Sequence, residues 1–249
     1  MTTKDFGIDF GTARVVIYAV GKGVVLDEPA VIAVNANTGK MFACGEEAYA
    51  MQGRAPASIE VVRPLAKGVI ADFDYACMML RYFMQRVCAY KVIKPRAAVS
   101  VPALVTAVEQ RSFMDAVYSA GARQVMLIEE SMAAAVGAGL DVEAPRGCMV
   151  VEIGAGTTDV AVMSLKGVAS SCSRRVGGDA FDEAIMRYIR QKHRLLIGSL
   201  SAERLKIEVG KATDGEEEKC TTVSGRDAVS GLPRVCEITS HDILEAVYE

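Results

Sequence analysis

Two stretches of the chain repeat each other, and this repeat restricts the possible folds more than any other feature. The first is GIDFGTARVVIYAVGKG at residues 7–23, and the second is MVVEIGAGTTDVAVM at residues 149–163. In each stretch, apolar residues flank a short glycine-rich turn, which is typical of a β-hairpin. The alignment matches Asp9 with Glu152, Gly11 with Gly154 and, after one inserted residue, Lys22-Gly23 with Lys166-Gly167. The repeat predicts two similar lobes that carry one such hairpin each.

The small residues in these turns indicate phosphate binding. They let several backbone N–H groups converge on an anion. One glycine-rich hairpin alone is weak evidence, since most are merely tight turns. A matched pair about half a chain apart suggests two loops around one shared ligand. We therefore expect Gly11 and Gly154 to face the same crevice.

Length and composition are those of an ordinary globular protein. The 249 residues, 51% of them apolar and 24% charged, suffice for one large domain or two smaller ones. A net charge of -3 and a pI near 5.6 argue against bulk electrostatic attraction to nucleic acid.

Cysteine and histidine usage excludes several site chemistries. The seven cysteines never occur as CxxC, so neither a disulfide framework nor a zinc site is indicated, and reduced cytosolic thiols are expected. Only two histidines occur, far apart, which argues against a histidine-based triad. The start MTTKDF has no apolar segment of a signal peptide, and no apolar run reaches membrane-spanning length.

The first half of the chain alternates predicted strands and helices. Strands are expected at 6–10, 14–20, 24–26 and 30–34, and the looser stretch up to residue 64 suggests a small inserted subdomain. A helix capped by Asp72 or Asp74 follows, because apolar residues from Ala76 to Val87 recur at helical spacing.

The loop AYKVIKPR at residues 89–96 has two possible interpretations. Val92 and Ile93 stand among basic residues. They either pack under the loop or form an apolar tip with a basic collar that contacts anionic lipid.

Glu109 also has two possible roles. With Thr106 it has the spacing of a capping box, so its carboxylate could simply satisfy the start of a helix. It also follows the end of the predicted strand 97–101, where α/β folds present groups to ligands. Spacing alone favours the cap.

The second half predicts further short elements. Strand 125–128 and helix 131–139 precede a linker at Pro145-Arg146-Gly147. Asp179 is expected to cap a helix, and Ser201 to start another in which Glu203 and Lys206 face the same way. A pair of strands at 220–238 leads to a final helix capped by Ser240. That helix is only about two turns long at Glu249, which predicts a truncated chain.

The paired hairpins resemble the two phosphate motifs of the actin, DnaK-type chaperone and hexokinase superfamily. Shorter motifs resemble the MreB family of bacterial actins along essentially the whole chain. These are Asp27-Glu28-Pro29, Arg63-Pro64, Gly68-Val69-Ile70-Ala71-Asp72-Phe73, Gly121-Ala122-Arg123, Ile128-Glu129-Glu130, Gly177-Gly178-Asp179 and Glu203-Arg204-Leu205-Lys206.

The resemblance implies an α/β, actin-like ATPase fold with two duplicated lobes around a nucleotide cleft, the second lobe being incomplete. The first lobe would span 1–145, with an inserted subdomain at about 33–64. The second would span 146–249, with its large subdomain starting at 146–178, a small one at about 179–236, and the return to the large one cut off at 249.

The resemblance also implies a site for ATP and Mg²⁺. Asp9 and Glu152 would face the metal through water, and Glu109 would orient the attacking water. The phosphates would be held by Gly11, Thr12, Ala13, Arg14, Gly154, Ala155, Gly156, Thr157 and Thr158, and the nucleoside by Glu203 and Lys206. Three positions depart from the family pattern: Glu152 replaces Asp, Ala155 replaces the middle glycine, and Arg14 stands where the family has Asn.

The implied function is that of an actin-like cytoskeletal protein that assembles into homopolymeric filaments and governs bacterial cell shape. It would be at most a slow ATPase, peripheral at the inner face of the cytoplasmic membrane through Val92 and Ile93. Cell-wall elongation proteins would be partners and nucleic acid would not. The alternatives are a truncated fragment deficient in nucleotide binding and a small-molecule kinase of the same superfamily.

Overall fold

The computed structural model describes residues 5–88, 94–213, 215 and 217–248. Contacts between residues divide the chain into two compact units, Met1–Val176 and Gly177–Glu249. The predicted lobe boundary at 145/146 follows the internal repeat rather than these contacts, and it stays a prediction.

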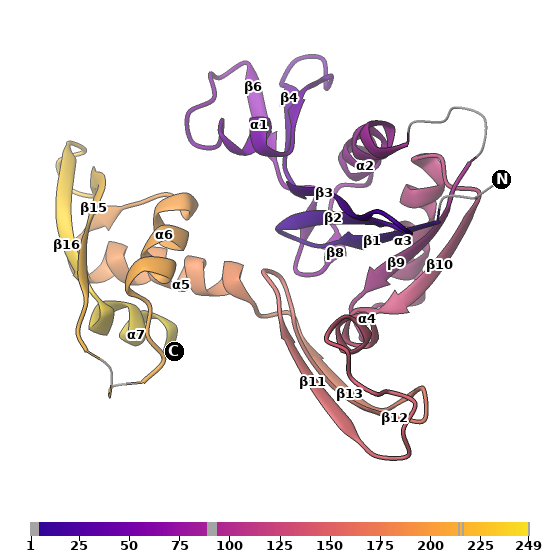
Figure 1. Cartoon of the computed structure of the whole chain (residues 1–249). Helices are drawn as coiled ribbons and strands as arrows, with labels where there is room; N and C mark the ends of the chain where they lie inside the picture. Colours follow the sequence, from indigo (N-terminus) through magenta and orange to yellow (C-terminus); the bar gives the residue numbers. More distant parts are fainter. Residues whose placement is uncertain (1–4, 89–93, 214, 216, 249) are drawn as a thin grey trace. The chain divides into compact units, whose positions relative to one another are not determined.

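A five-stranded sheet forms the centre of the first unit (Figure 1). Its order is β10-β9-β1-β2-β3, with β1 parallel to β9, β9 parallel to β10, and β1, β2 and β3 joined as an antiparallel meander. The strands are β1 (Asp5–Phe10), β2 (Arg14–Ala19), β3 (Gly23–Pro29), β9 (Arg96–Val101) and β10 (Gln124–Glu129). The predicted strands therefore fall on observed ones.

Helices α2 (Phe73–Val87) and α3 (Ala107–Ser119) pack against this sheet and against each other. Their apolar residues join those of the strands in one core, which includes Phe10, Phe83 and Phe113. Asp72 caps α2 by accepting a hydrogen bond from the Tyr75 N–H, at 3.0 Å. This confirms one of the two predicted caps and settles the choice between Asp72 and Asp74.

Small elements complete the stretch between β3 and α2. A three-stranded sheet of order β5-β4-β6 lies where the inserted subdomain is predicted. Its elements and the next strand pair are β4 (Ile32–Asn35), β5 (Met41–Cys44), α1 (Glu46–Tyr49), β6 (Ile59–Val62), β7 (Leu65–Ala66) and β8 (Val69–Ile70).

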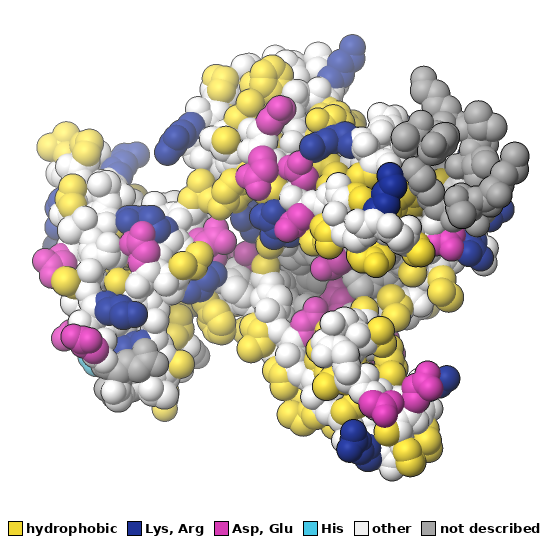
Figure 2. Space-filling view, in the orientation of Figure 1, with side chains coloured by type: hydrophobic (Ala, Val, Ile, Leu, Met, Phe, Trp, Pro, Cys, Tyr) yellow, Lys and Arg dark blue, Asp and Glu magenta, His cyan; other side chains and the backbone are white. Residues whose placement is uncertain are grey.

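The second predicted hairpin belongs to a separate three-stranded antiparallel sheet of the first unit. Its strands are β11 (Cys148–Ile153), β12 (Thr158–Ser164) and β13 (Gly167–Arg174), in that order. Helix α4 (Glu130–Gly137) packs on one face, where Ala135, Ala161 and Met163 are buried. On the other face, Met149, Val151 and Ile153 of β11 are exposed. Figure 2 shows hydrophobic surface over these strands.

The second unit has its own core, formed by three helices and a three-stranded sheet. Its elements are α5 (Gly178–His193), β14 (Leu195–Leu196), α6 (Ser199–Val209), β15 (Cys220–Asp227), β16 (Pro233–Thr239) and α7 (Ser240–Tyr248). The predicted strand pair at 220–238 is confirmed.

Three predicted helix starts are wrong by one to two residues. Gly177, not Asp179, is the N-cap of α5, and Asp179 lies in the first turn, where its charge complements the helix dipole. Helix α6 starts at Ser199 after Gly198. At α7, Thr239 forms the reciprocal cap with Asp242, while the Ser240 hydroxyl accepts the N–H of Lys219.

No helix among the described residues is both long and apolar enough to span a bilayer. Val92 and Ile93, the predicted lipid contact, lie outside the described residues.

Candidate functional site

The two repeated hairpins close in the same way. In the first, the Gly11 N–H donates to the carbonyl oxygen of Arg14 at 3.1 Å, and in the second Gly154 donates to Thr157 at 2.9 Å. Each turn therefore has four residues and one closing hydrogen bond. This confirms the predicted short glycine-rich hairpins, and the internal repeat extends to the backbone.

The two turns are in contact with each other. A Cβ atom built on Gly156 would lie 2.5 Å from the Thr12 hydroxyl oxygen and 2.6 Å from the Gly68 nitrogen, so only glycine fits. The Gly68 N–H in turn donates to that hydroxyl, at 3.0 Å. Gly68 itself has φ of 76° and approaches the Thr157 methyl group closely. This contact brings the two turns together, and a shared crevice for Gly11 and Gly154 stays a prediction.

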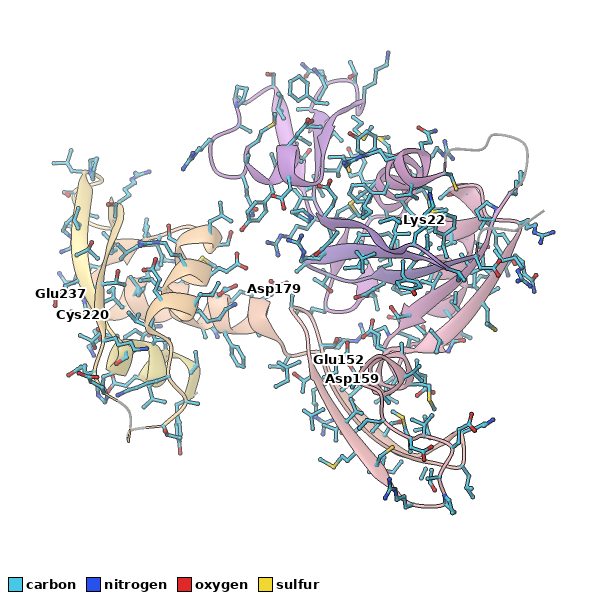
Figure 3. All side chains as sticks on the ribbon, in the orientation of Figure 1. Lys22, Glu152, Asp159, Asp179, Cys220 and Glu237 are labelled. Carbon is cyan, nitrogen blue, oxygen red and sulfur yellow. The ribbon has the colours of Figure 1, made fainter. Side chains whose placement is uncertain are left out.

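Carboxylates from both hairpins gather beside the turns. Asp9 lies at the end of β1, and Glu152 pairs with Asp159 across β11 and β12 (Figure 3). Asp159 is 1% exposed and accepts a hydrogen bond from the Ala103 N–H at 3.3 Å. Figure 2 shows acidic side chains close together between the β1–β2 sheet and α4. Among the described residues, one oxygen each of Glu152 and Asp159 is buried without a hydrogen-bond partner.

Burial and mutual repulsion shift the pKa values of these carboxylates. Loss of hydration raises the pKa of Asp9, and the hydrogen bond that its carboxylate accepts from the Ser100 hydroxyl at 3.2 Å opposes this shift. Burial and the charges of Asp9 and Asp159 raise the pKa of Glu152. Like charges held together in this way are relieved by a bound cation.

Glu130 is a member of the cluster that the sequence analysis did not assign to the site. It opens α4 directly after β10. Burial, followed by the charges of Glu152, Asp9 and Asp159, raises the pKa of Glu130 to about 8. The available signal was its position at the carboxyl end of a parallel strand, inside the motif Ile128-Glu129-Glu130.

Glu109 forms the capping box that its spacing predicts. Its Oε2 atom accepts hydrogen bonds from the Thr106 N–H at 2.7 Å and the Thr106 hydroxyl at 2.9 Å. Its Oε1 atom accepts the Arg175 guanidinium at 2.8 Å. The Thr106 N–H, with Arg175, lowers the pKa of Glu109. Both oxygens of this carboxylate are therefore engaged.

Other predicted phosphate-loop residues have structural contacts of their own. Arg14 forms an ion pair with Asp27 of β3, with Nε 2.6 Å from Oδ1. The Ala13 carbonyl accepts the Ala30 N–H at 2.8 Å. The Thr158 hydroxyl donates to the Val176 carbonyl at 2.8 Å. Ala155 is partly buried in its turn.

The predicted nucleoside contacts lie in the second unit. Lys206 of α6 forms an ion pair with Asp182 of α5 at 2.9 Å, and it donates to the Gly178 carbonyl at 3.0 Å. Burial raises the pKa of Asp182; Lys206 opposes this, and the charges of Glu203 and Asp179 add to it. Glu203 and Lys206 therefore both interact with Asp182.

Solved structures with a similar fold identify the class of protein. MreB5 of Spiroplasma citri bound to AMPPNP matches with a TM-score of 0.92 and 35% identity over 100% of this chain and 75% of that chain. The MamK double helical filament matches with a TM-score of 0.78 at 20% identity, which supports the fold alone. The chain thus has the actin-like fold of two duplicated lobes.

Sequence comparison identifies the family. The family model described as MreB/Mbl protein matches residues 3–249. The cell shape-determining protein Mbl of Bacillus cereus is 45% identical over 100% of this chain and 75% of its own length. MreB of Escherichia coli K12 is 46% identical over 100% of this chain and 74% of its own. The chain belongs to the MreB/Mbl family and is an actin-like cytoskeletal protein.

Proposed function

We propose that this chain binds ATP with Mg²⁺ between its paired hairpins and assembles into filaments that govern cell shape. The observation that carries the proposal is the contact of Gly156 with Thr12 beside the carboxylates of both hairpins. Support comes from similar proteins, since MreB5 was crystallised with AMPPNP and with ADP, and the Mbl and MreB relatives are cell shape-determining proteins.

The chain's own residues fit a triphosphate and its metal ion. The turns at Gly11 to Arg14 and Gly154 to Thr158 would hold the phosphates through the backbone N–H groups that follow Gly11 and Gly154, whose own N–H groups close the turns. Oxygens of Asp9 and Glu152 suit Mg²⁺, which retains most of its waters in proteins. Among the described residues no three His, Cys, Asp or Glu side chains are placed to ligate one ion directly, and the proposed contact runs through water. The ion would neutralise phosphate charge during transfer.

Two glutamates are candidates for handling the attacking water. The family resemblance favours Glu109, but its oxygens are occupied by Thr106 and Arg175. The geometry favours Glu130, because it lies within the acidic cluster and its pKa of about 8 suits a group that accepts a proton near neutral pH. We propose that Glu130 takes the proton and that Glu109 maintains the start of α3. Hydrolysis would be slow and coupled to filament turnover.

The proposed location is the cytoplasmic face of the membrane. Val92 and Ile93, flanked by Lys91, Lys94 and Arg96, would insert into the interface while the basic residues contact anionic headgroups. Cell-wall elongation proteins are the proposed partners.

Calorimetry with Mg-ATP, followed by sedimentation with and without nucleotide, tests the proposal. We expect binding and nucleotide-dependent pelleting. Liposomes containing anionic lipid should recruit the chain, and replacing both Val92 and Ile93 with Ser should abolish recruitment without changing nucleotide affinity. Absence of Mg-ATP binding by the folded chain contradicts the central proposal.

A further inference from the structure

Three side chains of the second unit form a line that the proposed function does not use. His193 at the end of α5 meets Cys236 of β16 and Asp242 in the first turn of α7, which lie 43 and 49 residues further along the chain. The Cys236 Sγ atom lies 3.5 Å from His193 Nδ1, and His193 Nε2 lies 3.4 Å from Asp242 Oδ1. A thiol, a base and a carboxylate that orients the base are the components of an activated cysteine.

Asp242 is fixed as an anion. Its Oδ2 atom accepts the Thr239 N–H at 2.9 Å, and its Oδ1 atom lies 2.9 Å from the Lys192 ammonium. Burial opposes ionisation, but these two partners and His193 bring the pKa of Asp242 down to about 2. A permanent carboxylate at Nε2 keeps a proton on that nitrogen and leaves Nδ1 free to accept one from sulfur.

The position of His193 adds to this effect. It is the last residue of α5, and the carbonyl end of a helix favours a cation. The charged and titratable groups around it are Lys192 and Tyr188 on α5, Arg234 on β16, and Asp242 and Glu245 on α7. Arg234 donates to the His193 backbone carbonyl, which ties β16 to the end of α5.

We propose that Cys236 is a modification site that reacts with small disulfides to form a mixed disulfide. The Cys236 proton moves to His193 Nδ1, and the thiolate attacks one sulfur of the small disulfide. A new S–S bond forms as the old one breaks, and the departing thiolate takes the proton from His193. No other oxidant is needed.

Cys220 provides an internal control. It is exposed on β15, whereas Cys236 is partly buried on the helix-facing side of the sheet with Ile238. Strand register places Cys220 on the same outer face as Glu237, diagonally across the strands (Figure 3). Exposure alone therefore predicts faster reaction at Cys220, and activation by His193 predicts faster reaction at Cys236.

The test is a time course of the full chain with oxidised glutathione at pH 7, followed by peptide mass spectrometry. We expect Cys236 to be modified about tenfold faster than Cys220 or more. His193→Gln should slow Cys236 to the rate of Cys220 or below. Asp242→Asn, which keeps an acceptor for the Thr239 cap, should also slow it. Equal or slower modification of Cys236 in the wild type overturns the proposal, as does an unchanged rate in folded His193→Gln.

The pH profile of the wild type provides a test that needs no variant. Activation by His193 predicts that the ratio of the Cys236 rate to the Cys220 rate falls as pH rises from 6 to 8. Parallel profiles for the two cysteines contradict activation. Neither measurement depends on nucleotide binding, so the result is independent of the proposed ATP site.

Discussion

The two hairpins share one backbone turn but differ in their surroundings and in the residues at their tips. The first lies in the centre of a five-stranded sheet, with β1 between β9 and β2, whereas β11 of the second is an edge strand among the described residues. At equivalent positions the first has Thr12 and Ala13 where the second has Ala155 and Gly156. The Thr12 hydroxyl of the first turn occupies the space that a side chain at Gly156 of the second turn would need. The similar sequences of the two hairpins therefore explain their common turn, and the different residues at the turn tips explain how the turns contact each other.

The largest effect is expected from filling this contact. Gly156→Val should push Thr12 and Gly68 apart at a cost of about 1–3 kcal/mol, which corresponds to a roughly tenfold to hundredfold loss of Mg-ATP affinity. A substitution at the equivalent position of the first hairpin, Ala13→Gly, should alter Mg-ATP affinity far less. Calorimetry measures both. Gly137→Ala in α4, where an added Cβ meets nothing within 4 Å, is the matched control. Equal losses in the two hairpins would refute the asymmetry.

Burial and carboxylates of both hairpins raise the pKa of Glu130, whereas Thr106 and Arg175 lower the pKa of Glu109. Glu130→Gln should lower single-turnover hydrolysis by about 10²- to 10⁴-fold with nucleotide affinity retained. Glu109→Gln should lower it by less than about tenfold, because Gln still serves at this position of a capping box. The reverse order would restore Glu109 as the residue that positions water.

The pH dependence of stability should reveal the same cluster. Because the folded pKa of Glu130 is about 8, the folded state binds a proton that the unfolded state releases above its ordinary value near 4.5. The contribution of Glu130 to the free energy of unfolding should therefore be fully present below about pH 4.5 and be lost as pH rises towards 8. The slope from this group is at most about 1.4 kcal/mol per pH unit.

Urea unfolding between pH 5 and pH 8 measures this slope. Glu130→Gln should flatten it, and saturating Mg-ATP should flatten it in the wild type. A slope that persists unchanged in Glu130→Gln would assign it to other groups.

The smallest effect is expected at Arg14. Replacing it with Thr copies the equivalent residue of the second hairpin, Thr157, into the first. The lost ion pair with Asp27 is half exposed, so stability should fall by no more than about 1 kcal/mol. Mg-ATP affinity should change little, since the side chain is held by β3. A loss as large as that of Gly156→Val would show that Arg14 contacts the nucleotide.

Local patterns in the sequence predicted much of the fold. Hairpin turns, the Asp72 cap and the Thr106–Glu109 capping box depend on residues close in sequence, and each is observed. The cap of α7 shows the limit. Ser240 has the right chemistry, but its hydroxyl bonds to Lys219 and Thr239 takes its place. The choice of cap therefore depends on Lys219, which lies 21 residues earlier in the chain.

The candidate site shows the same contrast between local sequence patterns and long-range packing. The repeat predicted the two turns and the carboxylates Asp9 and Glu152, and these come close together. The sequence signals only that Glu130 follows a strand. Its place in the acidic cluster depends on how α4 packs against β11 and β12, which no spacing in the sequence encodes. The partners of Arg14 and Glu109 also come from other elements. Long-range packing therefore decides which of the candidate side chains remain available to a ligand.

The absence of a side chain at Gly156 makes that position an adjustable spacer. Ala, Ser and Val there would form a series of increasing side-chain volume that widens the separation of the turns while the carboxylates of Asp9, Glu130 and Glu152 stay unchanged. Such a series would separate effects on nucleotide affinity from effects on the rate of hydrolysis. The lifetime of an assembled polymer could then be tuned by the volume of one buried residue.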